Sequence, residues 1–210
     1  MKAAALFSGG KDSLYALQLA EKQGVTINHL LTLLPTLPWP SPHAKNIESL
    51  KILAESMNKQ LTIVDFKKEG AFIEVLKSFE VDALLAGDIF VEAHRLGLEE
   101  VCSQVGLNLL EPLYGRDTLE LFYEIFNSGF EALITGVNLK FLGEELLGFV
   151  INRKTIDSFL LKIKGVDPLG ENGEFHTLVL DCPLYSKSFK LFSSEKKVAR
   201  DMAYLTVSIM

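Results

Sequence analysis

Along this chain, short runs of apolar residues take turns with segments in which apolar residues recur every three or four positions, the spacing of a helix. An apolar run at 3–7 leads into two glycines, after which Leu14, Leu17 and Ala20 recur at helical spacing. This order predicts a strand, a tight turn and a helix. Further apolar runs predict strands at 25–34, 61–66, 81–86, 107–110 and 132–137. Helical spacing predicts helices at 43–58, 71–79, 92–105 and 119–126.

The regular alternation of strands and helices indicates the fold class. Consecutive strands joined by helices form parallel sheets with right-handed crossovers, so we expect a doubly wound, mostly parallel α/β sheet of about five strands. We expect this Rossmann-like domain to span residues 1–137.

The pattern changes after residue 137. Helical patterns at 138–164 lead into a glycine-rich, acidic turn region at 165–174. Strands are then expected at 175–181, 189–192 and 204–209. We therefore predict a small C-terminal α+β lobe over residues 138–210, with antiparallel strands and a role in substrate recognition.

Composition narrows the functional class. The chain has 210 residues, 48% of them hydrophobic, and a net charge of −6 with scattered basic residues. Scattered positive charge argues against nucleic-acid binding, which depends on neutralising phosphates. Apolar runs fall short of the ~20 residues of a membrane span, and the N-terminus lacks a signal-like pattern, so a cytoplasmic protein is expected. Cys102 and Cys182 lack metal-ligand spacing, which predicts reduced thiols and no zinc site.

The turn after the first strand has the composition of a phosphate-binding loop. Successive glycines let backbone N–H groups face an anion, and the following helix adds its positive end. Lysine supplies a point charge for phosphate, and the flanking serine hydroxyls can donate to phosphate oxygens or cap the helix. The predicted nucleotide-binding residues are Ser8, Gly9, Gly10, Lys11, Asp12 and Ser13.

Two common phosphate loops do not fit the spacing. Ala5 occupies the first glycine position of a Walker loop, and Asp12 follows Lys11 where Ser or Thr is required. Lys11 also occupies the second glycine position of a dinucleotide fingerprint. The loop instead resembles the SGGxDS loop of the PP-loop ATP pyrophosphatases, in the adenine nucleotide alpha hydrolase superfamily. That resemblance implies that the loop binds the pyrophosphate of ATP while chemistry occurs at the α-phosphate.

Other candidates follow later strands, at the edge where open α/β sheets bind ligands. Gly87 permits close backbone approach, and Asp88 either holds Mg²⁺ or caps the next helix. Arg95, on that helix, either reaches a phosphate or is solvated. The proline-rich segment 35–42 predicts an extended loop, whose Trp39 either stacks on a ligand or anchors the loop.

His43 directly follows this loop. It is interpreted either as a helix-start residue or as a site residue.

A second informative stretch lies in the C-terminal lobe. By itself it reads as a solvated acidic turn that enters a strand. Together with the loop at Ser8, it resembles the diphthine-ammonia ligase family, which has a Gly-Glu-x-Gly-Glu-aromatic-x-Thr motif. The matching residues are Gly170, Glu171, Gly173, Glu174, Phe175 and Thr177. Asp181, the 183–185 segment and the 102–113 segment continue the likeness, whereas Tyr114, Phe149 and the 91–95 segment depart from the family pattern.

The resemblance implies an ATP-dependent, AMP-forming ligase that amidates diphthine on elongation factor 2 with ammonia. It implies ATP and Mg²⁺ as cofactors, with Lys11 and Asp12 acting on the phosphates and Asp12 and Asp88 positioning the metal. Glu171 and Glu174 would attract trimethylammonium or ammonium, and Phe175 would offer a cation-binding face. Two alternatives stay open: an adenylating enzyme with another carboxylate acceptor, and a nucleotide sensor without turnover. A homodimer is compatible with either activity.

Overall fold

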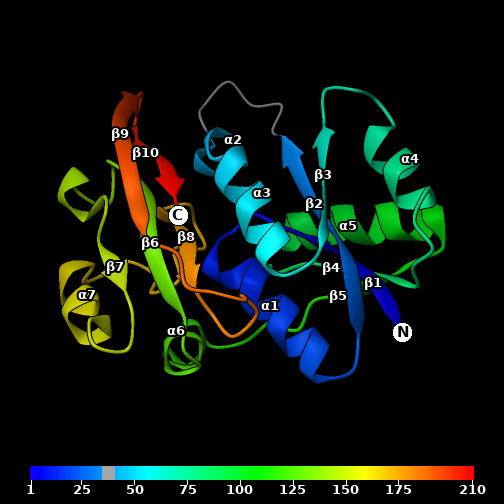
Figure 1. Ribbon diagram of the computed structural model, residues 1–210, viewed down its shortest axis with the longest axis horizontal. Helices are drawn as coiled ribbons and strands as arrows, with labels where there is room; N and C mark the ends of the chain where they lie inside the picture. The colour runs from blue at the N-terminus through cyan, green and yellow to red at the C-terminus, as the bar shows by residue number, and fades with distance from the viewer. Residues whose placement is uncertain (35–40) are drawn as a thin grey trace.

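The computed structural model describes residues 1–34 and 41–210. Figure 1 shows two sheets side by side, with helices α1 and α3 in the space between them. The N-terminal half forms β1 Lys2–Leu6, α1 Lys11–Lys22, β2 Thr26–Leu34, α2 Pro42–Lys45, α3 Ile47–Ser56, β3 Gln60–Asp65, α4 Ala71–Lys77, β4 Ala83–Leu85, α5 Glu92–Val105 and β5 Asn108–Leu110. The C-terminal half forms α6 Thr118–Asn127, β6 Glu131–Asn138, the 3₁₀ turn η1 Glu144–Leu146, β7 Val150–Ile151, α7 Ile156–Lys162, β8 Phe175–Asp181, β9 Leu191–Ala199 and β10 Met202–Ile209.

The first sheet has five parallel strands in the order β3-β2-β1-β4-β5. The chain winds outward from β1 to β3, then crosses back to β4 beside β1. Strand order therefore reverses between β1 and β4, and such a switch point leaves a crevice at the carboxyl ends of the two strands. This confirms the expected doubly wound parallel sheet and places the Ser8 and Gly87 segments at the same crevice.

The second sheet is antiparallel, with the order β7-β6-β10-β9 and β8 paired to β6. This confirms the C-terminal lobe, but one strand was assigned to the wrong sheet. The 132–137 strand, expected to complete the parallel sheet, is β6 and pairs only with C-terminal strands among the described residues. Six successive residues of β6 are buried, so its apolar run looks like that of a central parallel strand.

Both faces of the parallel sheet are covered. On one face, α1, α3 and the second sheet share a core that contains four fully buried phenylalanines, Phe122, Phe126, Phe130 and Phe159. On the other face, Phe72 and Leu76 of α4 and Cys102 of α5 pack against Ala4, Leu31 and Leu84 of the sheet. A strand buried on both faces must be apolar throughout, which is why the Ala3, Ala4 and Ala5 run is not alternating.

The segment expected to be helical at 138–164 is more varied. It contains η1, the short strand β7 and helix α7. β7 completes one edge of the second sheet through Ala132 and Leu133, a tertiary pairing that helical spacing does not reveal. Both cysteine thiols are free and buried, and within 1–34 and 41–210 no helix has the length and apolarity needed to cross a bilayer.

Candidate functional site

The loop between β1 and α1 turns sharply at its first glycine. Gly9 has φ +70°, and a Cβ there would collide with the Leu50 side chain, so the position requires glycine. Gly10 is the N-cap of α1 and has no side-chain cap. The turn therefore directs the loop backbone and the positive end of α1 toward the crevice.

The second lobe supports this loop through two backbone contacts. The Val179 N–H donates to the Gly9 carbonyl at 2.9 Å, and the Lys11 N–H donates to Thr177 Oγ1 at 3.2 Å. Gly10 N–H also has a hydroxyl partner, Ser8 Oγ, at 3.2 Å. The backbone amides of this loop were expected to be free to bind an anion, but those of Gly10 and Lys11 donate to hydroxyl groups. The contacts from Thr177 and Val179 show that β8 supports the loop.

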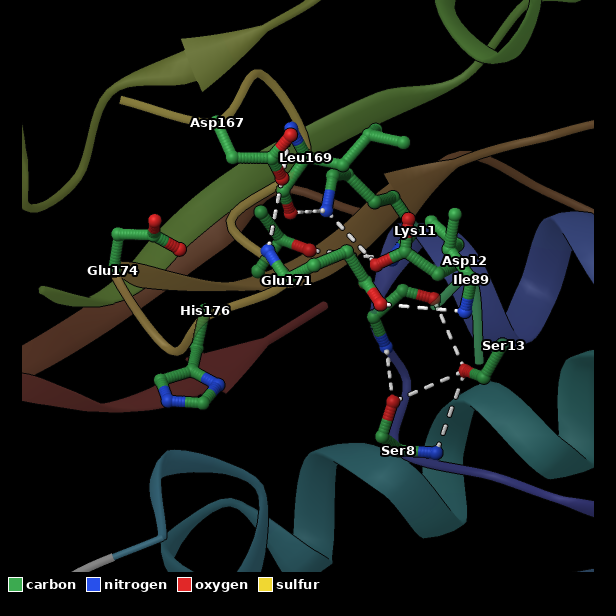
Figure 2. A network of polar contacts seen from close by, with 12 residues as sticks. Ser8, Lys11, Asp12, Ser13, Ile89, Asp167, Leu169, Glu171, Glu174 and His176 are labelled. Carbon is green, nitrogen blue, oxygen red and sulfur yellow. Dashed lines mark hydrogen bonds and ion pairs between the residues drawn. The ribbon is translucent and has the colours of Figure 1, made fainter. Parts of the chain in front are cut away.

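Lys11 is buried and already has partners of its own. Its Nζ donates to Asp12 Oδ2 at 2.8 Å and to the Leu169 carbonyl at 2.6 Å (Figure 2). The same nitrogen lies 5.1 Å from the centroid of the Phe175 ring. Lys11 therefore joins the phosphate loop to the acidic turn of the second lobe, and Phe175 offers its aromatic face to Lys11.

Two carboxyl groups adjoin this lysine. Burial raises the pKa of Asp12, while the Lys11 charge opposes this rise. Asp12 Oδ2 is paired with Lys11, whereas Asp12 Oδ1 is buried and has no hydrogen-bond partner among the described residues. Burial, followed by the Asp12 charge, raises the pKa of Glu171 to about 8. Glu171 Oε2 accepts from the Ile89 N–H at 3.3 Å, so this carboxyl reaches across to the loop after β4.

The structure brings Glu171 into the site and does not bring Glu174. Figure 2 shows Glu174 apart from Lys11, Asp12 and Glu171. Glu174 is only 5% exposed, and its carboxylate accepts from Asn172 N at 2.9 Å and Asn172 Nδ2 at 3.0 Å. Glu174 therefore stabilises the turn that presents Glu171, and the acceptor-binding role stays a prediction that this geometry does not favour.

The Gly87 segment touches the start of α1. A Cβ at Gly87 would lie 2.9 Å from Ser13 Cα and 3.0 Å from the Asp12 carbonyl carbon, so only glycine lets the two segments approach this closely. Asp88 Oδ1 lies 2.9 Å from His94 Nδ1. In the described ranges, no group of three or more His, Cys, Asp or Glu side chains is arranged to hold a metal ion. Asp12 Oδ1 is nevertheless an unpartnered hard oxygen ligand of the type that Mg²⁺ takes together with phosphate oxygens.

Two adjoining cavities open over this loop. The smaller, about 290 Å³, lies against the ends of β1 and β2 and is lined by Phe7, Leu31, Thr32 and Leu33 among others. The larger, about 760 Å³, extends from the loop to the acidic turn. Both are lined by Ser8, Asp12, His43, Asp88 and Glu171. Ser8 lines both cavities and Ser13 lines the smaller one, with Ser8 Oγ 3.1 Å from Ser13 Oγ.

The outcomes for the remaining candidates differ. His43 is the second residue of α2, as expected of a helix-start residue, and it also lines both cavities, so a site role stays a prediction. Arg95 packs over the Tyr114 ring at 5.3 Å, pairs with Glu99 and is absent from the described lining of either cavity. Trp39 lies outside the described residues.

Several site residues had no recognisable signal in the sequence. The Asp167 carboxylate accepts from Leu169 N at 3.2 Å and Glu171 N at 3.0 Å, which fixes the turn that carries the lysine acceptor. Leu169 acts through its carbonyl, which any residue provides. His176 lines the larger cavity from β8 and was not among the residues predicted for the site. The His176 side chain reaches this cavity because β8 pairs with β6, and the sequence pattern did not predict that pairing.

A phosphate loop at the switch point of a doubly wound sheet, supported by an antiparallel lobe, defines a nucleotide-binding α/β protein. Comparison with known protein families identifies the family within this class. A family described as "Diphthamide synthase N-terminal domain" matches residues 1–109, and "Diphthamide synthase C-terminal domain" matches residues 117–209. The chain belongs to the diphthamide synthase family.

Curated relatives agree along the full length. The chain is 28% identical over 242 residues to the diphthine–ammonia ligase of Homo sapiens, covering 100% of this chain and 90% of that protein. It is 30% identical to the diphthine–ammonia ligase of Bos taurus, covering 93% of this chain and 84% of that protein. Among solved structures, a predicted subunit of a tRNA methyltransferase from Methanocaldococcus jannaschii aligns with a TM-score of 0.45 and 18% identity over 87% of this chain and 98% of that chain.

Proposed function

We propose that this protein is an ATP-dependent, AMP-forming ligase that amidates a carboxylate with ammonia, in the manner of a diphthine–ammonia ligase. The observation that carries this proposal is the match of both family domains, over residues 1–109 and 117–209. The loop geometry agrees, because Gly9 and Gly10 stand at a helix N-terminus with Lys11 beside them.

We assign ATP to the two adjoining cavities. The pyrophosphate lies over the Ser8–Ser13 loop, where the dipole of α1 and the Lys11 ammonium favour negative charge. The adenosine enters the cavity of about 290 Å³, whose apolar wall at Leu31 and Leu33 suits a base. This arrangement leaves the α-phosphate facing the larger cavity, which has room for an acceptor.

Mg²⁺ fits the same loop. Asp12 is the ligand we assign first, because its Oδ1 is buried and unpartnered in the described structure. Asp88 lines both cavities and is the second ligand. When bound, the ion would neutralise phosphate charge.

The side chains of the site suit carboxylate activation. A carboxylate resists attack by amines because oxide is a poor leaving group. An acceptor carboxylate oxygen attacks the α-phosphorus, the bond to the bridging oxygen breaks, and pyrophosphate leaves with the electron pair. Lys11 and the loop dipole stabilise the charge that develops on pyrophosphate. Ammonia then attacks the acyl carbon, and AMP leaves.

The acceptor we propose is diphthine on elongation factor 2, because the curated relatives are named for that substrate. Glu171 is the carboxyl group positioned to face it, since it lines both cavities. Glu174 is held inside its own turn.

The products of ATP turnover test this function. Purified protein would be incubated with ATP, ammonium and elongation factor 2 that bears diphthine, and the nucleotide products separated. AMP, pyrophosphate and a modified acceptor are expected. Formation of ADP and phosphate instead would contradict the proposal. AMP formation with another carboxylate only would favour a different acceptor, and ATP binding without turnover would favour a sensor.

A further inference from the structure

Two histidines meet where the cavities of this site join. His43 comes from α2 and His176 from β8, and their rings lie edge to face with centroids 5.1 Å apart. His43 lines the cavities of about 290 and 760 Å³. His176 lines the cavity of about 760 Å³ and a third, of about 550 Å³, whose lining includes Lys140 and Arg200. The pair therefore stands between the proposed nucleotide site and a separate opening.

The fold makes a specific place for this pair. In the β6–β8 pairing the register shifts between Ile134 and Gly136, which sets Gly136 opposite His176. A Cβ at Gly136 would lie 2.6 Å from Pro42 Cγ and 3.3 Å from His176 Cδ2. The bulge and the missing side chain thus let both the His176 ring and the residue before His43 pack against β6.

The surroundings keep both rings neutral. Burial lowers the pKa of His43 to about 4, with a smaller lowering from Lys11 that a hydrogen bond with the Ser8 backbone opposes. Burial, His43 and Lys11 lower the pKa of His176 to about 3. A neutral imidazole keeps one unprotonated nitrogen that accepts a hydrogen bond. The Lys11 charge also disfavours a second cation here, so the pair suits a small neutral donor more than an ammonium ion.

We propose that the His43–His176 pair binds the ammonia that attacks the activated acceptor. This inference rests on the proposed ligase function. The neutral rings accept N–H hydrogen bonds from ammonia at the junction of the cavities. The cavity of about 550 Å³, which shares Asn172, Gly173 and His176 with the larger one, lets ammonia enter without crossing the nucleotide.

The chemical step balances with these groups alone. The ammonia lone pair forms the new C–N bond to the acyl carbon, and the C–O bond to AMP breaks with its electron pair leaving on AMP. The nitrogen then carries one proton too many, which it releases to water in the cavity, while the neutral histidine rings act only as hydrogen-bond acceptors. The products are the amide, AMP and one proton.

The test separates ammonia use from adenylation. His176→Phe removes the acceptor nitrogen and keeps a ring, whereas His176→Gln keeps a hydrogen-bond acceptor. His29→Phe is the matched control, because His29 lies on β2 stacked on Phe79 at 4.3 Å, away from this site. For each protein, amide formation is followed against ammonium concentration, and adenylation is followed by acceptor-dependent exchange of labelled pyrophosphate into ATP.

For His176→Phe, kcat/KM for ammonium should fall on the order of 10-fold, the effect of losing one hydrogen bond, while pyrophosphate exchange stays within about 2-fold of wild type. His176→Gln should keep a KM for ammonium near that of wild type, because its side-chain oxygen also accepts a hydrogen bond, and a large rise in that KM would overturn the inference even if the Phe variant fails to fold. His29→Phe should match wild type in both assays. Unchanged ammonium kinetics in His176→Phe, or an equal loss of pyrophosphate exchange, would overturn the inference. Absence of exchange in wild-type protein would instead overturn the proposed ligase function.

Discussion

Lys11 and Asp12 are neighbours in the sequence and also partners in the site, with Lys11 Nζ 2.8 Å from Asp12 Oδ2. The lysine side chain is 3% exposed and the aspartate side chain 22% exposed. A buried charge is tolerated when it is paired, and each of these residues supplies the charge that the other needs. Lys11, which we propose binds phosphate, thus also has a structural role that its position in a glycine-rich loop does not suggest.

Because of this ion pair, substitutions at Lys11 and Asp12 should affect the stability and the activity of the protein differently. Lys11→Met keeps the stem volume and removes the charge, leaving Asp12 without its partner. We expect a loss of stability of about 3 kcal/mol and a fall in kcat on the order of 10²-fold. The double variant Lys11→Met with Asp12→Asn removes both charges, so it should recover most of the stability and none of the activity. Urea unfolding and AMP formation measured on all three proteins check this. Full stability in the single variant would show that the pair contributes little.

The close approach of Gly87 to α1 predicts a second effect. Gly87→Ala places a methyl group 2.9 Å from Ser13 Cα, against backbone that cannot move aside easily. We expect a loss of stability of about 2 kcal/mol and weaker ATP binding, because the shift moves the start of α1. Gly97→Ala in α5 is the control, since no atom lies within 4 Å of its added Cβ and helix propensity should raise stability by up to about 1 kcal/mol. Thermal unfolding and ATP titration of both variants would decide. Equal behaviour of the two would contradict the close-packing argument.

The raised pKa of Glu171 predicts a dependence of stability on pH. A pKa of about 8 in the folded protein, against the ordinary value of 4.5, means that the folded state holds this proton more tightly than the unfolded state. The proton's contribution to stability is fully present below pH 4.5 and is lost as pH rises through about 8. Glu171→Gln mimics the protonated form and retains an acceptor for the Ile89 N–H. It should be more stable than wild type by at least about 1 kcal/mol at pH 8 and nearly equal at pH 4.5. Chemical unfolding at both pH values measures this, and a pH-independent difference would refute the shift.

Asn46 lies between α2 and α3 and links them to β10 of the second sheet, so its substitution tests how much this link contributes to stability. Its buried side-chain amide donates to the Pro42 carbonyl at 2.8 Å and the Leu205 carbonyl at 3.0 Å. Its side-chain oxygen accepts from Val207 N at 2.7 Å. Asn46→Ala leaves these groups unsatisfied and should cost about 3 kcal/mol, whereas Asn46→Asp keeps the acceptor and removes both donors. Both variants should unfold at lower urea concentration than wild type. Wild-type stability in Asn46→Ala would mean that water replaces all three bonds.

Local patterns in the sequence determined the first half of the fold and the centre of the site. The apolar runs and helical spacing predicted five parallel strands with their helices, because each such element must bury its own apolar face. The composition of the Ser8–Ser13 segment predicted its tight turn and the helix that follows, since φ > 0 at Gly9 and a helix start are local requirements, while phosphate binding by this loop stays a prediction. The carboxyl edge of a parallel sheet then brought Gly87 and Asp88 to the same crevice.

Tertiary structure alone decided what surrounds that loop. β6 is apolar enough for either sheet, and only its pairing with β8 and β10 places it in the second one. Glu171 and Glu174 are three positions apart in one motif, yet one reaches the Ile89 amide and the other is held by Asn172, because the turn fixed by Asp167 orients them differently. His43 and His176 meet through a bulge opposite Gly136, a relationship between distant segments that no local period encodes. Local patterns specify which elements form, whereas long-range pairing and packing decide which side chains share a cavity.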